Sequence, residues 1–217
     1  MRYTIEEGHP LPHNPFKAIC APRPIGWISS LDADGRANLA PYSFFNGIAD
    51  DPPMVMFSVT GRKVGREAEV KDSLANVRAT EEFAVNIVSW ELKDQMNLTS
   101  GGWEHEQDEF ELAGLEKADC LLIKAPRVKA APATLECVLH QEVVLPQGRR
   151  GTENVMVLGR VVAVHVQDDL VTDGIFDLTK FHPVARCGYK DYAVVRELFE
   201  MTRPGGGDAE AMSARAG

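Results

Sequence analysis

The sequence has few cysteines, no excess of basic charge and no long apolar run. Its thiols are scattered and form no C-x-x-C pair; they are Cys20, Cys120, Cys137 and Cys187. Zinc sites and disulfide scaffolds cluster their thiols, so we expect reduced, buried cysteines in a cytoplasmic protein and no metal site. The net charge of -9 argues against binding to nucleic acid or to an anionic membrane surface.

Other patterns are missing too. No stretch of about 18 apolar residues predicts a transmembrane span, and residues 1–7 lack the apolar core of a signal peptide. No G-x-G-x-x-G or G-x-S-x-G motif occurs, and no nucleophile has an evident partner base, so we predict no catalytic side chain. The acidic stretch Trp103–Phe110 has no second ligand cluster and is expected to be a solvated loop.

The sequence leaves the roles of two histidines open. His165 lies in an apolar segment, where a core or interface residue is commoner than a catalytic one. His182 precedes a proline and lies near Arg186 and Tyr189 in the sequence, and a contact of either histidine with a dinucleotide phosphate is left open.

What the chain does have is short, β-branched apolar segments, which are typical of strands. Hydrophobic residues make up 44% of the chain, enough for a core. Strands are predicted at residues 25–31, 36–41, 54–60, 83–88, 134–145 and 154–166. The last of these should be buried on both faces or bent at Gly159.

Helices are fewer and shorter. One should begin at a cap formed by Asp72, Ser73 or a near neighbour and run to about Ala79. Others are predicted at 90–98, 108–112 and 192–199. The fold class is therefore mainly β, an antiparallel barrel with a few flanking helices. We divide the chain into an arm (1–16), one domain (17–202) and a glycine-rich, disordered tail (203–217).

The densest group of chemically useful residues lies near the N-terminus. Arg23–Ser29 and Asp51–Ser58 flank Asn38–Asn46, a run of small polar and aromatic residues. Such a run offers amides, hydroxyls and flat apolar faces, which suit a heteroaromatic ring with a polar edge. Taken alone, the run favours a turn between core aromatics.

The order of these motifs resembles the flavin reductase-like family, the FMN-binding split barrels. Four motifs carry the resemblance: Arg-Pro-Ile-Gly-Trp-Ile-Ser at 23–29, Asn-Leu-Ala-Pro-Tyr-Ser-Phe-Phe at 38–45, Asp-Pro-Pro at 51–53 and Lys-Asp-Ser-Leu-Ala-Asn at 71–76. Three later segments, 82–88, 159–165 and 183–189, match in the same order. The resemblance covers about residues 15 to 200. It implies an antiparallel split β-barrel that binds FMN.

The resemblance also implies a set of cofactor-binding residues. Phosphate contacts are expected from Arg62, Lys63, Lys71 and Ser73. Ring contacts are expected from Asn38, Ala40, Pro41, Tyr42, Ser43 and Phe44, with Arg23, Pro24, Ile25, Gly26 and Ser29 approaching from another side. Without the resemblance, a capped surface helix with a solvated lysine would explain the segment 71–79 equally well.

The implied activity is that of an FMN oxidoreductase. It would take hydride from NAD(P)H onto flavin and pass electrons to free flavin, a partner monooxygenase, oxygen or a metal chelate. The family also implies a homodimer. Two alternatives remain open at this point: a flavoredoxin-like electron carrier that is not an enzyme, and a binding protein that keeps the barrel without turnover.

Overall fold

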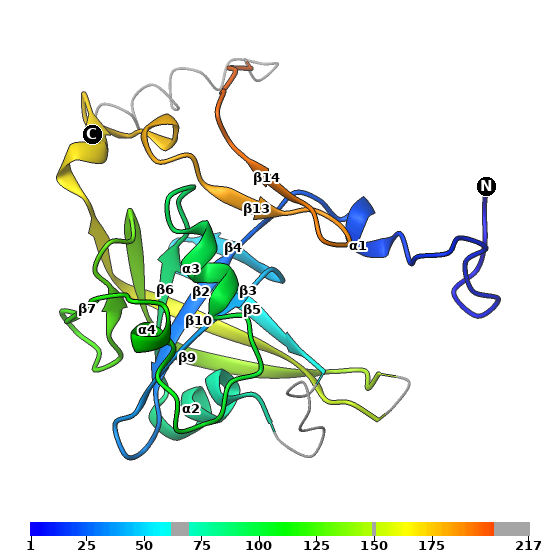
Figure 1. Cartoon of the computed structure of the whole chain (residues 1–217), viewed down its shortest axis with the longest axis horizontal. Helices are drawn as coiled ribbons and strands as arrows, with labels where there is room; N and C mark the ends of the chain where they lie inside the picture. Colours follow the sequence, from blue (N-terminus) through cyan, green and yellow to red (C-terminus); the bar gives the residue numbers. More distant parts are fainter. Residues whose placement is uncertain (62–69, 149–150, 202–217) are drawn as a thin grey trace.

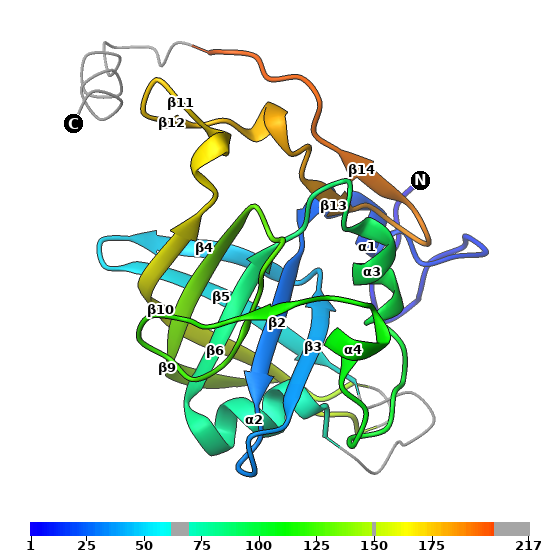
Figure 2. The same ribbon diagram turned by 60° about the vertical axis from the view of Figure 1, so that its left-hand side comes forward.

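A seven-stranded antiparallel sheet forms the centre of the protein. The computed structural model describes residues 1–61, 70–148 and 151–201. The strand order is β3-β2-β6-β9-β10-β5-β4, and the sheet curls into an open barrel (Figure 1; Figure 2). Its strands are β2 (Gly26–Leu31), β3 (Ala37–Tyr42), β4 (Phe45–Asp50), β5 (Pro53–Thr60), β6 (Glu82–Ile87), β9 (Ala133–Leu145) and β10 (Asn154–Val166). The predicted strands are confirmed, and β4 is one that the sequence did not predict.

The barrel interior is filled by alternate residues of its strands. In β5, Val55, Phe57 and Val59 are buried while their neighbours are partly exposed, as expected for a strand with one face on the core. The rings of Phe57 and Phe83 meet edge to face at 5.3 Å. Burying a side chain of this kind stabilises a fold by roughly 1.5–3 kcal/mol.

The hairpin of β9 and β10 is the longest element, with 13 residues in each strand. Its register shifts between Leu158 and Gly159, which confirms the predicted bend. A side chain at Gly159 would overlap the buried ring of Phe83, so the close approach requires glycine. Burial on both faces is wrong for most of β10, because buried and partly exposed residues alternate along Val155–Val161.

Short helices α2 (Asp72–Thr80), α3 (Lys93–Leu98) and α4 (Glu109–Leu112) pack against the barrel strands, and α1 (Phe16–Ile19) lies in the N-terminal arm. Trp27, Met96 and Phe110 are buried together in a second core beneath α3 and α4. The N-cap position of α2 is Lys71, a near neighbour of Asp72 and Ser73, as the prediction allowed, but its side chain makes no capping hydrogen bond. The helix predicted from 90 begins at Lys93.

A smaller sheet lies beside the barrel (Figure 2). It joins β1 (Arg23–Pro24), β13 (Val184–Arg186) and β14 (Tyr192–Val194). The helix predicted at 192–199 is wrong, because its first residues pair with β13 instead. The remaining elements are β7 (Lys117–Ala118), β8 (Arg127–Val128), β11 (Val171–Thr172), β12 (Ile175–Phe176) and two short 3-10 turns, Asp168–Leu170 and Leu178–Lys180.

The C-terminal tail and the lack of a membrane-spanning segment were also predicted from the sequence. The tail predicted from residue 203 lies outside the described residues, and the domain boundaries stay a prediction. Within the described parts of the chain, no helix has the length and apolar character needed to cross a bilayer.

Candidate functional site

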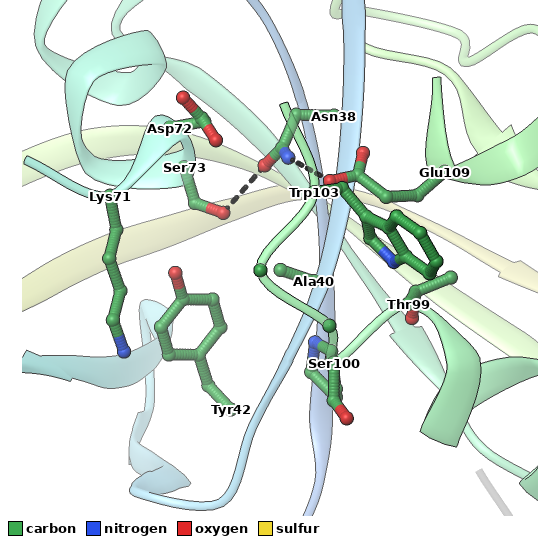
Figure 3. A pocket seen from close by; sticks show the side chains of 13 residues that line it. Asn38, Ala40, Tyr42, Lys71, Asp72, Ser73, Thr99, Ser100, Trp103 and Glu109 are labelled. Carbon is green, nitrogen blue, oxygen red and sulfur yellow. Dashed lines mark hydrogen bonds between the residues drawn. The ribbon is translucent and has the colours of Figure 1, made fainter. Parts of the chain in front are cut away.

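A pocket of about 620 Å³, counted with its open mouth, lies between β3, the start of α2 and the segment joining α3 to α4. Figure 3 shows polar side chains from these elements pointing toward one another. The lining residues are Asn38, Ala40, Pro41, Tyr42, Lys71, Asp72, Ser73, Thr99, Ser100, Gly101, Gly102, Trp103 and Glu109.

A chain of buried hydrogen bonds forms the floor of the pocket. The Ser73 hydroxyl donates to Asn38 Oδ1 at 2.8 Å, and Asn38 Nδ2 donates to Glu109 Oε1 at 2.9 Å (Figure 3). The amide of Leu39 donates to the other Glu109 oxygen at 2.9 Å. These bonds tie α2, β3 and α4 together. Buried groups that are satisfied in this way hold a site in one geometry.

Glu109 is the carboxyl group inside the site. Burial raises its pKa to about 7, against the opposing effect of the Leu39 amide. Glu109 is only 5% exposed and Phe110 is fully buried, so the expectation of a solvated acidic loop is wrong for the end of Trp103–Phe110. Asp108 caps α4 by accepting from the Phe110 amide, but the buried partners of Glu109 are Asn38 and Leu39, which lie far away in the sequence.

Lys71 supplies a cation at the pocket's edge. It stands immediately before α2, and its Nζ lies 5.7 Å from the centre of the Tyr42 ring. Burial, with a contribution from Lys17, lowers the pKa of Lys71. Burial raises the pKa of Tyr42 to about 12, so its hydroxyl keeps its proton at neutral pH. The site thus places a partly desolvated ammonium group beside a neutral phenol and a helix N-terminus, where an anion is favoured.

The wall opposite Lys71 comes from residues 99–103. Trp103 donates its indole N–H to the carbonyl of Leu98 at 2.9 Å. A Cβ at Gly101 would lie 2.7 Å from that indole nitrogen, so glycine is needed for the close approach. Thr99 is buried and accepts the indole N–H of Trp27 at 2.8 Å. The sequence analysis missed this wall; a Ser-Gly-Gly run directly after a helix was the available signal.

The structure brings together six of the predicted site residues: Asn38, Ala40, Pro41, Tyr42, Lys71 and Ser73. Arg62 and Lys63 lie outside the described residues. Ser29 does not line the pocket; it is fully buried, donates to the Pro126 carbonyl and accepts from Asn86. Ile25 packs in the second core, and Gly26 lies against the ring of Phe45.

Arg23 and Phe44 form a neighbouring group with the N-terminal arm. The Arg23 guanidinium lies 5.7 Å from the Phe44 ring centre, and Lys17 Nζ lies 5.9 Å from it. Arg23 also donates to the carbonyls of Lys17, Cys20 and Cys187. Pro24 is exposed and Ser43 is half-buried at this end of the barrel.

The fold is that of an open antiparallel β-barrel with a polar pocket at its side, and the sequence identifies the family. The sequence model of the flavin reductase like domain matches residues 19–185. The chain therefore belongs to the flavin reductase-like family and has its FMN-binding split-barrel fold.

Individual relatives agree with this assignment. An uncharacterized protein of Aquifex aeolicus is 36% identical over 175 residues, which cover 80% of this chain and 85% of the relative. The crystal structure of nitrilotriacetate monooxygenase component B from Bacillus cereus has a TM-score of 0.79 and 29% identity, covering 89% of this chain and 100% of that one.

A third comparison concerns the fold alone. A putative flavin reductase with a split barrel domain from Shewanella frigidimarina has a TM-score of 0.76 at 22% identity, covering 94% of this chain and 99% of that one.

Proposed function

We propose that this protein binds FMN in the pocket beside α2 and takes hydride from NAD(P)H onto the flavin. The observation that carries the proposal is the joint position of Lys71, the start of α2 and the buried Ser73–Asn38–Glu109 chain on one pocket, in a chain of the flavin reductase-like family. A cation and a helix N-terminus suit a phosphate. The adjoining polar and aromatic groups suit a flat ring with hydrogen-bonding edges.

The phosphate would be held at the α2 end. Lys71 contributes charge and the amides at the start of α2 donate. The Ser73 hydroxyl donates to Asn38 Oδ1 at 2.8 Å, so it would donate to the phosphate only by turning its proton away from Asn38. Arg62 and Lys63 precede this helix in the sequence and remain proposed contacts. The donor set fits a dianionic monophosphate. An FMN preference over FAD is proposed because no adenine-binding fingerprint occurs in the chain.

The ring would be held by the β3 end of the site. Asn38, Ala40, Pro41 and Tyr42 line the pocket, and the following Ser43 and Phe44 are half-buried at its continuation. Trp103 closes the opposite wall. Arg23, Pro24, Ile25 and Gly26 support this end by anchoring the arm and the barrel rim rather than by lining the pocket.

The chemistry itself belongs to the cofactor: bound flavin accepts a hydride at a ring position, and the protein binds, orients and shields it. No acid–base side chain is needed for that transfer. Glu109 holds a proton through part of the neutral pH range because of its raised pKa. Its place on the pocket floor keeps Asn38 oriented through the 2.9 Å hydrogen bond.

The proposed electron acceptors are free flavin, a partner monooxygenase, oxygen or a metal chelate. The likeness to component B of a nitrilotriacetate monooxygenase supports the monooxygenase partner. We further propose a homodimer, because the pocket is open and a second subunit would shield a bound ring from water.

An absorbance spectrum of the purified protein tests both parts of the proposal. Titration with FMN and FAD, followed by flavin fluorescence, should show the tighter binding for FMN. Bound FMN should then bleach on addition of NADH or NADPH. Binding of FAD at equal strength would contradict the cofactor assignment. Tight FMN binding without bleaching by either nucleotide would instead support the electron carrier, and no binding of either flavin would overturn the proposal.

A further inference from the structure

A group of potential metal ligands lies on the outer face of the barrel, away from the residues that line the pocket. Cys120, Glu136 and His165 come from the β7–β8 loop, β9 and β10. One ligand atom of each residue lies within 4.8 Å of the others. The sequence analysis expected no metal site because the thiols are scattered, but the fold brings one thiol to a histidine and a carboxylate from distant segments.

The strand register explains the meeting of the two strand residues. Ala163 pairs with Glu136, and His165 is two residues further along β10, so it is a diagonal neighbour on the same face. That face points away from the barrel interior, where the next residue, Cys137, is buried in the main core. Loop residues Ile123 and Ala125 cover the outer face and are themselves buried. The site is therefore enclosed by the loop that carries Cys120.

Hydrogen bonds tie Glu136 to His165 and to the loop that carries Cys120. His165 Nε2 lies 2.5 Å from Glu136 Oε1. The amides of Leu121 and Leu122 donate to the two Glu136 oxygens at 2.6 and 2.7 Å. Although burial acts in the other direction, these bonds and His165 hold the pKa of Glu136 below its usual value. Burial and the Glu136 charge raise the pKa of Cys120 to about 12, so the thiol keeps its proton.

We propose that Cys120, Glu136 and His165 form a binding site for a thiophilic divalent cation of the zinc class. Thiolate, imidazole and carboxylate are the ligand types that Zn²⁺ prefers. The charges also suit a buried ion, because one thiolate and one carboxylate neutralise a divalent cation. The ion would take the place of the thiol proton and of the proton between His165 and Glu136.

The geometry needs only small adjustment. Zinc–ligand distances of about 2.0–2.3 Å place tetrahedral ligand atoms roughly 3.3–3.8 Å apart. The imidazole and carboxylate, 2.5 Å apart, would move apart by about 1 Å, and the thiol, within 4.8 Å of both, would approach by at most about 1.5 Å. The His165 side chain is 19% exposed, which leaves a path for the ion and a place for a water as fourth ligand.

Cobalt titration of chelator-treated, flavin-free full-length protein tests the site. Tetrahedral Co²⁺ with a thiolate ligand gives visible bands at wavelengths beyond the absorption of oxidised flavin. We expect one Co²⁺ per chain, displacement of Co²⁺ by Zn²⁺, and proton release on binding as the thiol ionises. Cys120→Ser and His165→Gln should each weaken the affinity at least tenfold and remove or alter the bands.

The control variants are Cys20→Ser and His140→Gln, since both residues are exposed and lie outside the cluster. They should bind Co²⁺ as the wild type does. FMN titration of all variants checks folding and is expected to be unchanged. The proposal is overturned if wild-type protein shows no cobalt bands, or if Cys120→Ser and His165→Gln bind as tightly as the controls. The three residues then serve only as a hydrogen-bonded clamp on the loop.

Discussion

At the scale of single residues, the proposed site predicts that Lys71 is needed for tight binding of FMN but not of riboflavin. Its ammonium group stands beside the start of α2 on the pocket edge. If it contacts the phosphate, Lys71→Ala removes a charge-assisted hydrogen bond worth about 1.5–3 kcal/mol. We expect FMN affinity to fall roughly tenfold to a hundredfold, with riboflavin nearly unaffected because it has no phosphate. Fluorescence titration with both ligands measures this.

Lys93→Ala is the matched control for that experiment. Lys93 also lies over an aromatic ring, 4.5 Å from the centre of Trp90, but does not line the pocket. The variant should bind both flavins as the wild type does. Equal losses of FMN and riboflavin in Lys71→Ala would mean that the lysine supports the fold or the ring instead.

Glu109 makes stability depend on pH. Burial raises its folded-state pKa to about 7, above the value near 4.5 in the unfolded chain. The folded protein therefore binds the proton more tightly, and stability is lost as pH rises from 4.5 through 7. This loss amounts to about 3 kcal/mol at most, from about 1.4 kcal/mol per pKa unit.

Denaturant unfolding of wild type and Glu109→Gln between pH 5 and pH 8 measures the effect. The free energy of unfolding of the wild type, relative to the variant, should decrease as pH rises. The neutral amide of the variant has no titration in this range, so it serves as the reference. A difference that stays constant or increases with pH would contradict the assigned pKa of Glu109.

Some residues of the site could be predicted from the sequence, and others could not. Asn38, Tyr42 and Lys71 lie in motifs with local signatures, and the structure places all of them on one pocket. Glu109 and Trp103 belong to a stretch whose composition is acidic and polar. Whether such a carboxylate is buried depends on Leu39 and Asn38, which lie far away in the sequence. No local pattern contains that information.

At the scale of elements, the bend in β10 depends on Gly159. A methyl group there would overlap the ring of Phe83, which is fully buried and has no room to yield. We expect Gly159→Ala to destabilise the protein by about 1–3 kcal/mol through overpacking. For a chain of this size that lowers the melting temperature by roughly 2–4 °C per kcal/mol. A thermal melt followed by circular dichroism records the change.

Gly47→Ala is the control, because a Cβ at Gly47 meets no atom within 4 Å. It should change the melting temperature by less than the Gly159 variant. If both variants melt alike, the close packing of Phe83 against the bend is not what limits the size of residue 159.

Strands were predicted well where buried and exposed residues alternate along the sequence. They were predicted less well where pairing with a distant strand decides the secondary structure. β5 alternates buried and exposed residues, so its pattern alone identifies it. Tyr192–Val194 has no such pattern and becomes a strand because β13 offers a partner. β4 was missed for a related reason: as an edge strand it is largely exposed, and its glycine and aspartate lower the β propensity.

At the scale of the whole molecule, we predict a homodimer whose core does not need the C-terminal tail. The tail after Arg203 is rich in glycine and poor in large apolar residues. Deleting residues 205–217 should leave mass in solution, flavin content and melting temperature unchanged. Light scattering, absorbance and calorimetry measure these quantities. A monomeric wild type would contradict the dimer, and a melting temperature lowered by several degrees would contradict the independence of the tail.

The strand order has a consequence for the growing chain on the ribosome. Hairpins β2–β3 and β4–β5 lie within the first 60 residues, yet they are far apart in the sheet. β6, β9 and β10 lie between them, and β10 ends at Val166. Until that strand emerges, β5 lacks its second neighbour and Val55, Phe57 and Val59 have no closed interior to enter. Barrel closure therefore waits until β10 has been synthesised, and the apolar face of this early hairpin has no closed core to pack into before then.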